Sequence, residues 1–132
     1  MKYLVAFFML IAFTAFNQSD DKSDKILDRL SLFMRIGGIT LWPWIIIRPN
    51  HRNMMKLINH ESIHIKQQEE LLVIPFYLLY VLEWIIKLFV YGGPRGAYRN
   101  LSFEREANKF ESDYTYIRTR NFWAWTKYIF KE

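Results

Sequence analysis

The sequence predicts a small, mainly α-helical domain with a short β element (α+β), and three observations support this fold class. Apolar residues recur at helical spacing along most of the chain after Asp24. A single stretch, Ile39 to Arg48, is instead rich in β-branched and aromatic residues. The 132 residues have room for one modest core and a handful of helices. We therefore expect one domain over residues 17–132.

The composition points towards a membrane and limits the possible metal ligands. Hydrophobic residues make up 52% of the chain and aromatic residues 18%, above the usual share for a soluble domain. The net charge of +5 favours an anionic partner, either lipid headgroups or nucleic acid, and composition alone does not choose between them. Because the chain has no cysteine, disulfides and thiolate metal sites are excluded. Any zinc must be held by His, Asp or Glu.

The first sixteen residues have the pattern of a targeting segment. Lys2 is followed by an apolar run from Tyr3 to Phe16, and a polar stretch follows. The run is shorter than the roughly 20 residues that a spanning helix needs. Residues 1–16 are therefore predicted to be a signal peptide or an uncleaved N-terminal membrane anchor. An amphipathic helix is expected next, over 24–34.

The middle of the chain predicts β structure followed by a long helix. Pro43 lies inside the stretch 39–48 and would remove one ladder donor, so we expect either a pair of short strands or one edge strand. Pro49 and Asn50 predict a turn. Apolar residues at helical spacing then predict a helix from about Asn53 to Val73.

The segment Leu71 to Tyr91 is strongly apolar and predicts a membrane-associated helix. Its two charged residues, Glu83 and Lys87, are four positions apart and can pair on one helix face. They give the segment a polar stripe that a helix surrounded by lipid would not want. We therefore expect this helix to lie in the membrane interface or to dip into one leaflet, with Trp84 at headgroup depth.

The remaining segments predict a breaker, a charged helix and an interfacial tail. The breaker is the glycine- and proline-rich stretch 92–96, and the helix is expected over Ser102 to Arg118. The tail, 122–130, carries Trp123 and Trp125 beside lysine, as segments at headgroup depth do.

A metal-binding pattern lies on the predicted helix 53–73. It reads His60-Glu61-Ser62-Ile63-His64, an HExxH motif. Four residues turn an α-helix by about 400°, so the two imidazoles lie on nearly the same face, one turn apart, and can bind one zinc ion. Glu61 lies beside them, where its carboxylate can act as general base towards a water on the metal.

Catalytic zinc needs a third protein ligand, and carboxylates for it lie downstream. Glu104-Arg105-Glu106-Ala107-Asn108 resembles the E-x-x-x-D helix of gluzincins of the CAAX prenyl protease and HtpX type and of the proteases that sense β-lactams. The resemblance covers 59–111. It implies Glu104 as third ligand and Asn108, where the family has Asp, as hydrogen-bond partner of a ligand histidine. Glu106 is the alternative ligand.

The resemblance implies a zinc metallopeptidase with a zincin-like core, in which the HExxH helix packs on the Glu helix. Its substrate would be a peptide or protein near a bacterial cell membrane, and its other partner the lipid surface. No recognised nucleic-acid motif is present, so a nucleic-acid partner is not expected. The alternative function is a non-catalytic membrane-surface adaptor that keeps the scaffold.

Several residues stay open as helpers at such a site. His51, Gln67 and Gln68 are candidates for substrate contact, with a loop position or helix packing as the ordinary alternatives. Tyr114 and Arg118 are candidates for the group that stabilises the transition state.

Overall fold

The computed structural model describes residues 37–47 and 52–130. In these ranges a β-hairpin is followed by five α-helices and a 3₁₀ helix. This arrangement confirms the mainly helical α+β class. The predicted N-terminal signal or anchor, the helix over 24–34, the turn at 49–50 and His51 lie outside the described residues.

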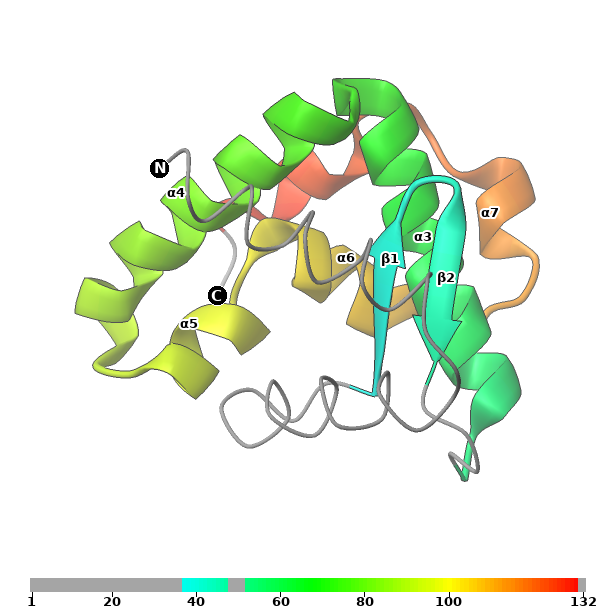
Figure 1. Ribbon diagram of the computed structural model, residues 1–132, viewed down its shortest axis with the longest axis horizontal. Helices are drawn as coiled ribbons and strands as arrows, with labels where there is room; N and C mark the ends of the chain where they lie inside the picture. The colour runs from blue at the N-terminus through cyan, green and yellow to red at the C-terminus, as the bar shows by residue number, and fades with distance from the viewer. Residues whose placement is uncertain (1–36, 48–51, 131–132) are drawn as a thin grey trace, which may run out of the picture.

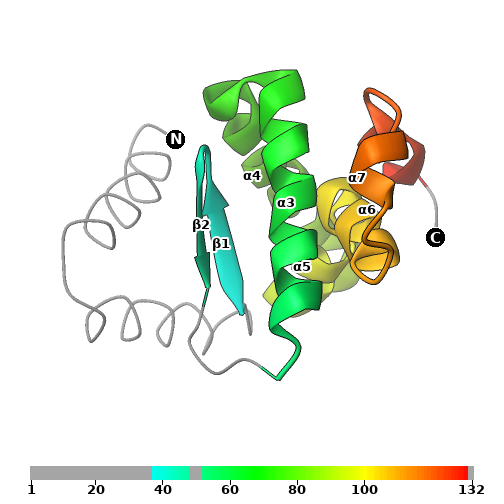
Figure 2. The same ribbon diagram turned by 90° about the vertical axis from the view of Figure 1, so that its right-hand side faces the viewer.

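The hairpin consists of β1 (Gly38–Leu41) and β2 (Trp44–Ile47), paired antiparallel with Gly38 opposite Ile47. It confirms a pair of short strands rather than one edge strand. Figure 2 shows the hairpin on one side of helix α3 (Met54–Leu71) and the orange and red C-terminal helices on the other. Gln68 of α3 ties the hairpin down, because it accepts a hydrogen bond from Trp42 N at 2.9 Å and donates to Thr40 O at 3.1 Å.

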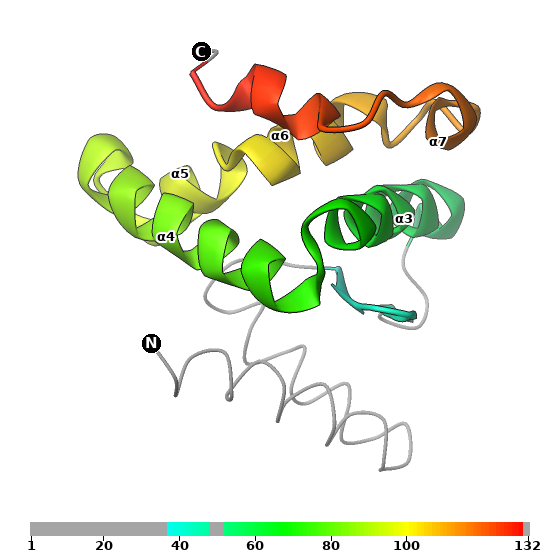
Figure 3. The same ribbon diagram turned by 90° about the horizontal axis from the view of Figure 1, so that it is seen from above.

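Helices α3 and α4 (Val73–Tyr91) meet at a sharp corner (Figure 3). Leu72 separates them with a φ of 64°. Pro75 lies in the first turn of α4 and has no N–H to donate to Leu71 O, so α3 cannot continue through this point. The predicted helix over about 53–73 is confirmed, with its end two residues earlier.

The chain returns to α3 through α5 (Pro94–Arg99) and α6 (Ser102–Phe110), as Figure 1 shows. α5 occupies much of the predicted breaker. The return is held by Glu83 of α4, whose carboxylate accepts from Ser102 N at 2.9 Å and from Ser102 Oγ at 2.7 Å. Lys87 pairs with Glu83 at 2.7 Å and donates to Asn100 O. The two charges thus face the protein.

The charged helix predicted over 102–118 is wrong in extent. α6 ends at Phe110, and a separate turn of helix, α7 (Tyr116–Thr119), follows. The Asn59 side chain explains the end, because its Nδ2 lies 3.0 Å from Phe110 O and 3.1 Å from both Glu111 O and Asp113 O. These carbonyls bond to a side chain of α3, and Phe110 O also accepts from Asp113 N at 2.9 Å, a bond three residues on that ends the α-helical pattern.

The main core lies where α3, α4, α6 and the 3₁₀ helix η1 (Ala124–Tyr128) meet. Its centre is Phe103, whose ring centroid lies 4.9 Å from that of Phe76 and 4.5 Å from that of Trp125. Trp125 is only 7% exposed, so its prediction as an interfacial residue is wrong. It instead fixes the C-terminal segment to α6. Trp123 is 42% exposed.

α4 carries its apolar residues on the outside. It is the one helix among the described residues long and apolar enough to cross a membrane, with a mean hydropathy of 1.9, and little of it is buried. We call its outward side the exposed apolar face of α4, and it contains no charged residue. Its large side chains are Ile74, Leu78, Leu79, Leu82, Ile85, Ile86, Phe89 and Val90.

Candidate metal centre

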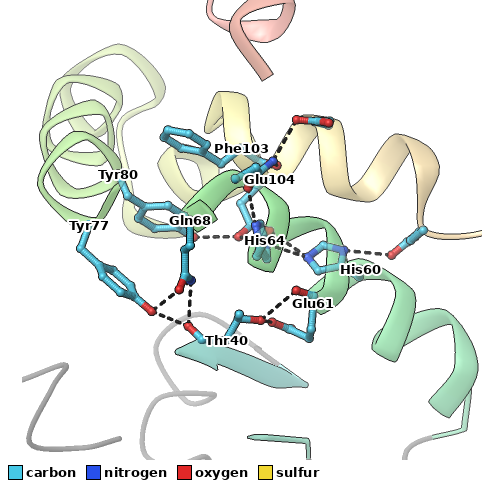
Figure 4. Close-up of polar contacts among 12 residues, drawn as sticks. Thr40, His60, Glu61, His64, Gln68, Tyr77, Tyr80, Phe103 and Glu104 are labelled. Carbon is cyan, nitrogen blue, oxygen red and sulfur yellow. Dashed lines mark hydrogen bonds and ion pairs between the residues drawn. The ribbon is translucent and has the colours of Figure 1, made fainter. Parts of the chain in front are cut away.

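His60 and His64 of α3 meet Glu104 of α6 in a buried cluster (Figure 4). Each residue offers one potential ligand atom, and these atoms lie within 4.8 Å of one another. The helical spacing of the histidines points both imidazoles towards α6. Glu104 lies in the first turn of α6, which Glu83 holds in place. The three residues predicted as metal ligands are therefore brought together.

The orientation of Gln67 identifies which His64 nitrogen carries a proton. Gln67 Nε2 donates to Phe103 O at 3.1 Å and to a Glu106 carboxylate oxygen at 3.0 Å, both of which are acceptors. Gln67 Oε1 must then be the atom 2.7 Å from His64 Nδ1. Because an amide oxygen only accepts, Nδ1 donates, and Nε2 of a neutral His64 has a free lone pair.

His60 is oriented in the same way by Glu111, just beyond the end of α6. Glu111 Oε2 lies 3.3 Å from His60 Nδ1, and Glu111 Oε1 pairs with Lys56 Nζ at 2.8 Å. A carboxylate that is paired with a lysine is ionised and accepts. The proton of a neutral His60 is thus on Nδ1, and its Nε2 lone pair also points into the cluster.

The cluster therefore brings together the two Nε2 lone pairs and the Glu104 carboxylate, and a positive charge between them would offset their mutual repulsion. The Nε2 atoms of His60 and His64 are 3.2 Å apart, and Glu104 Oε1 lies 3.2 Å from His64 Nε2. Glu104 Oε2 is buried and has no hydrogen-bond partner among the described residues. Tetrahedral zinc with bonds of about 2.0 Å holds its ligand atoms about 3.3 Å apart. The residues present fit that ion.

A proton on His64 is the alternative to a metal ion. Burial lowers the pKa of His64, but the charge and hydrogen bond of Glu104 outweigh it and raise this pKa to about 9. Burial likewise raises the pKa of Glu104, but the charges and hydrogen bonds of His64 and His60 together outweigh it and hold this pKa well below its usual range. Both pKa shifts favour a protonated His64 beside an ionised Glu104, which puts one positive charge into the cluster.

Glu61 points from α3 towards strand β1, beside the cluster (Figure 4). Thr40 Oγ1 donates to Glu61 Oε2 at 2.5 Å and approaches Glu61 O at 3.1 Å. Gly38 makes this approach possible, because a Cβ there would lie 2.9 Å from Glu61 Oε1. Burial raises the pKa of Glu61, although His64, His60 and Thr40 act against it.

A tyrosine from the neighbouring helix α4 holds Glu104 from its other side. Tyr80 donates to Glu104 Oε1 at 2.7 Å, and burial together with the charge of Glu104 raises the pKa of Tyr98 of α5. The carboxylate is thereby fixed towards the imidazoles. Sequence reasoning missed both tyrosines, because nothing distinguishes Tyr80 within the apolar segment.

Asn108 does not have the predicted role. Its side chain is exposed, and no hydrogen bond joins it to either histidine among the residues described. Glu111 takes the place predicted for it beside His60. The physical reason is the helix period, because Glu111 lies seven residues, about two turns, after Glu104 and returns to the same face. That spacing was a signal available in the sequence.

Glu106, the alternative ligand, is buried away from the cluster. It accepts from Arg120 Nε at 2.5 Å and from Tyr116 OH at 2.9 Å. Arg120 also pairs with Glu70 of α3. These bonds occupy Glu106 in joining α3, α6 and α7.

Of the residues considered as helpers, Gln68 lies beside the cluster. Gln67 orients His64, whereas Gln68 holds the hairpin and also lines the cavity beside the cluster. Tyr114 is 57% exposed and Arg118 is also exposed, and neither lines the cavity beside the cluster.

Comparison of the chain with protein-family models, with curated proteins and with solved structures found no match.

Proposed function

We propose that this protein is a zinc-dependent peptidase that works at a membrane surface. The observation that carries the proposal is the convergence of two imidazole lone pairs and the buried Glu104 carboxylate, whose oxygens lie 3.3 Å from His60 Nε2 and 3.2 Å from His64 Nε2. A second buried carboxylate, Glu61, lies beside them. A structural zinc site is closed by four protein ligands, whereas a catalytic site has three and an open position. Three candidate ligands and an adjacent base correspond to the catalytic type.

In this proposal each residue of the site has one role. His60, His64 and Glu104 bind zinc, which when bound polarises a peptide carbonyl and lowers the pKa of a water molecule. Glu61 would accept a proton from the attacking water on its carboxylate and deliver it to the leaving amine. Thr40 orients Glu61 by donating to its Oε2. Glu111 and Gln67 orient the histidines through their Nδ1 atoms.

The order of the site residues also supports the gluzincin resemblance. The histidines and Glu61 lie on one helix, and Glu104 lies on a second helix packed against it, with the apolar α4 between them in sequence. We propose a minimal zincin-like core on this basis. The departure is that Glu111, and not the residue at 108, contacts a ligand histidine.

The membrane part of the proposal rests on the exposed apolar face of α4. A soluble helix buries its apolar side and exposes its charges, but α4 turns Glu83 and Lys87 inwards and exposes apolar side chains. This inside-out distribution is what a lipid environment favours. We propose that the face lies in one leaflet of a cell membrane.

A single crossing of the bilayer by α4 would separate the site. His60 and His64 precede α4 and Glu104 follows it, yet all three belong to one cluster. α5 and α6 return along the inner side of α4 with charged residues such as Arg95 and Arg105. An orientation along the membrane surface satisfies both observations.

Metal analysis and a hydrolysis assay on the same purified preparation test this function. We expect about one zinc per chain and cleavage of some members of a broad peptide library, both removed by chelation. Zinc without hydrolysis of any peptide would contradict catalysis and favour the membrane-surface adaptor. Hydrolysis that survives removal of the metal would contradict the proposed site.

A further inference from the structure

A cavity of about 80 Å³ opens directly beside the candidate metal centre. Glu61 and His64 form part of its wall, so a ligand in the cavity touches the reacting groups. Gln68 of α3 and residues of β1, α4 and α5 form the rest, with Gly38, Val81 and Tyr98 among them. The cavity therefore lies where a substrate bound at the metal would extend.

The aromatic walls of this cavity present rings and not hydroxyl groups. The rings come from Phe76, Tyr77, Tyr80 and Tyr98. Tyr77 OH donates to Thr40 O, and Tyr80 OH donates to Glu104 Oε1. These phenol protons are already used inside the protein, so the walls offer a ligand mainly apolar surface. A charged or amide-bearing group placed there would lose its water without gaining a partner.

Strand β1 is not free to pair with a ligand at Thr40. Its carbonyl oxygen already accepts from Gln68 and from Tyr77. Recognition at this point therefore depends on filling the cavity with a side chain more than on adding a strand to the hairpin.

We propose that the cavity binds the side chain of the substrate residue next to the cleaved bond, and that it selects a branched aliphatic side chain such as that of valine or leucine. This inference rests on the proposed peptidase function. Its volume is roughly half that of an engineered cavity of about 150 Å³ that binds benzene. A side chain of three or four carbons fits that space, whereas an indole exceeds it.

Val81 allows a direct test, because it lines the cavity while its neighbour Leu82 lies on the exposed apolar face of α4. Val81→Phe fills the cavity, and Leu82→Phe makes the same kind of enlargement outside it. Peptides identical except for Ala, Leu, Trp or Asp next to the scissile bond are the probes. Wild type should cleave the Leu peptide at least about tenfold better than the Ala, Trp and Asp peptides, measured as kcat/KM.

Val81→Phe should reverse the preference for Leu over Ala, and Leu82→Phe should leave it unchanged. Val81→Ala is the second variant in case the larger side chain disturbs folding, and it should improve cleavage of the Trp peptide relative to the Leu peptide. Hydrolysis with no preference among the peptides, or a preference that neither Val81 variant changes, would overturn the inference while leaving the peptidase function standing.

Calorimetric binding to the Glu61→Gln protein separates the two proposals. The Leu peptide should bind more tightly than the Asp peptide, and Val81→Phe on the same background should remove the difference. Such binding without any hydrolysis by wild type would contradict the proposed peptidase function and support the proposed selectivity of the cavity. Equal binding of both peptides would contradict that selectivity.

Discussion

Glu104 and Glu106 are both buried carboxylates of α6, but their partners give them different roles. Glu104 faces His60 and His64, and Glu106 faces Arg120. Glu104→Ala should therefore abolish stoichiometric zinc binding, because two ligands remain. Glu106→Ala should keep the zinc but destabilise the fold by about 1–3 kcal/mol, since Arg120 Nε loses its partner while the guanidinium keeps its pair with Glu70.

Measurements of zinc content and of thermal unfolding on the purified Glu104→Ala and Glu106→Ala proteins test these two predictions. Glu106→Gln is the matched control, because it keeps the shape of the side chain and part of its hydrogen bonding. Loss of zinc in a folded Glu106 variant, with zinc retained after Glu104→Ala, would show that the third ligand is wrongly assigned.

Gly38 allows strand β1 to come close to Glu61. In Gly38→Ala the new Cβ would lie 2.9 Å from Glu61 Oε1 and 3.1 Å from Ile46 O. The carboxylate is the movable neighbour, so it should shift by a fraction of an ångström. A misplacement of about 1 Å costs on the order of 100-fold in rate. We expect hydrolysis to fall towards that level in kcat, with zinc content unchanged.

Gly93→Ala is the control for this substitution, because a Cβ at Gly93 has no heavy atom within 4 Å. It should behave as wild type in the same assay. Full activity of Gly38→Ala would argue against Glu61 as the base.

At the level of single residues, the sequence could predict the ligands but not what orients them. The spacing of His60 and His64 determines their common face in any α-helix. The assignment of Glu104 came only from a resemblance. Tyr80 and Tyr98 lie near Glu104 through the packing of α4 and α5, which no local pattern encodes.

The helices show the same division between local and long-range causes. α3 and α4 were predicted from their apolar spacing, with ends within two residues. The end of α6 at Phe110 depends on Asn59, which lies 51 residues earlier in the chain. The pairing of Glu83 with Lys87 was predictable from their spacing, but their inward direction depends on the first residue of α6, Ser102.

The orientation of α4 in a membrane can be tested with single cysteines, since the chain contains none. Glu69 on α3 and Ser112 after α6 are exposed and lie on the two sides of α4 in sequence. In intact membranes a membrane-impermeant reagent should label Glu69→Cys and Ser112→Cys from the same side. Leu82→Cys, on the exposed apolar face, should label poorly because lipid covers it.

Labelling of the two polar positions from opposite sides would contradict both the orientation along the surface and the common metal site. Full labelling of Leu82→Cys would contradict insertion of the face into lipid.

The stability of the whole molecule depends on the charges in the His60–His64–Glu104 cluster, so the free energy of unfolding should vary with pH. In the zinc-stripped protein the pKa of His64 is raised from 6.5 to about 9. The contribution of protonated His64 to the stability of the fold is then complete below pH 6.5 and is lost as the pH rises through about 9. The lowered pKa of Glu104 contributes stability above 4.5, which is lost at acidic pH.

Zinc competes with protons for the same lone pairs, so its binding strengthens as the pH rises. The difference in Tm between zinc-loaded and zinc-stripped protein should therefore widen from pH 6.5 to above pH 9. Thermal unfolding across this range measures it. A difference that narrows with rising pH would contradict the assignment of His64 as a ligand.

Zinc analysis and peptide hydrolysis measured together on Glu61→Gln test the peptidase proposal most directly. Glutamine keeps the shape of Glu61 and can still accept from Thr40, but it cannot take a proton. We predict unchanged zinc content, because Glu61 is not a ligand, and a fall in kcat of about 10²–10⁴-fold, the usual contribution of a general base. Turnover equal to that of wild type would contradict the mechanism.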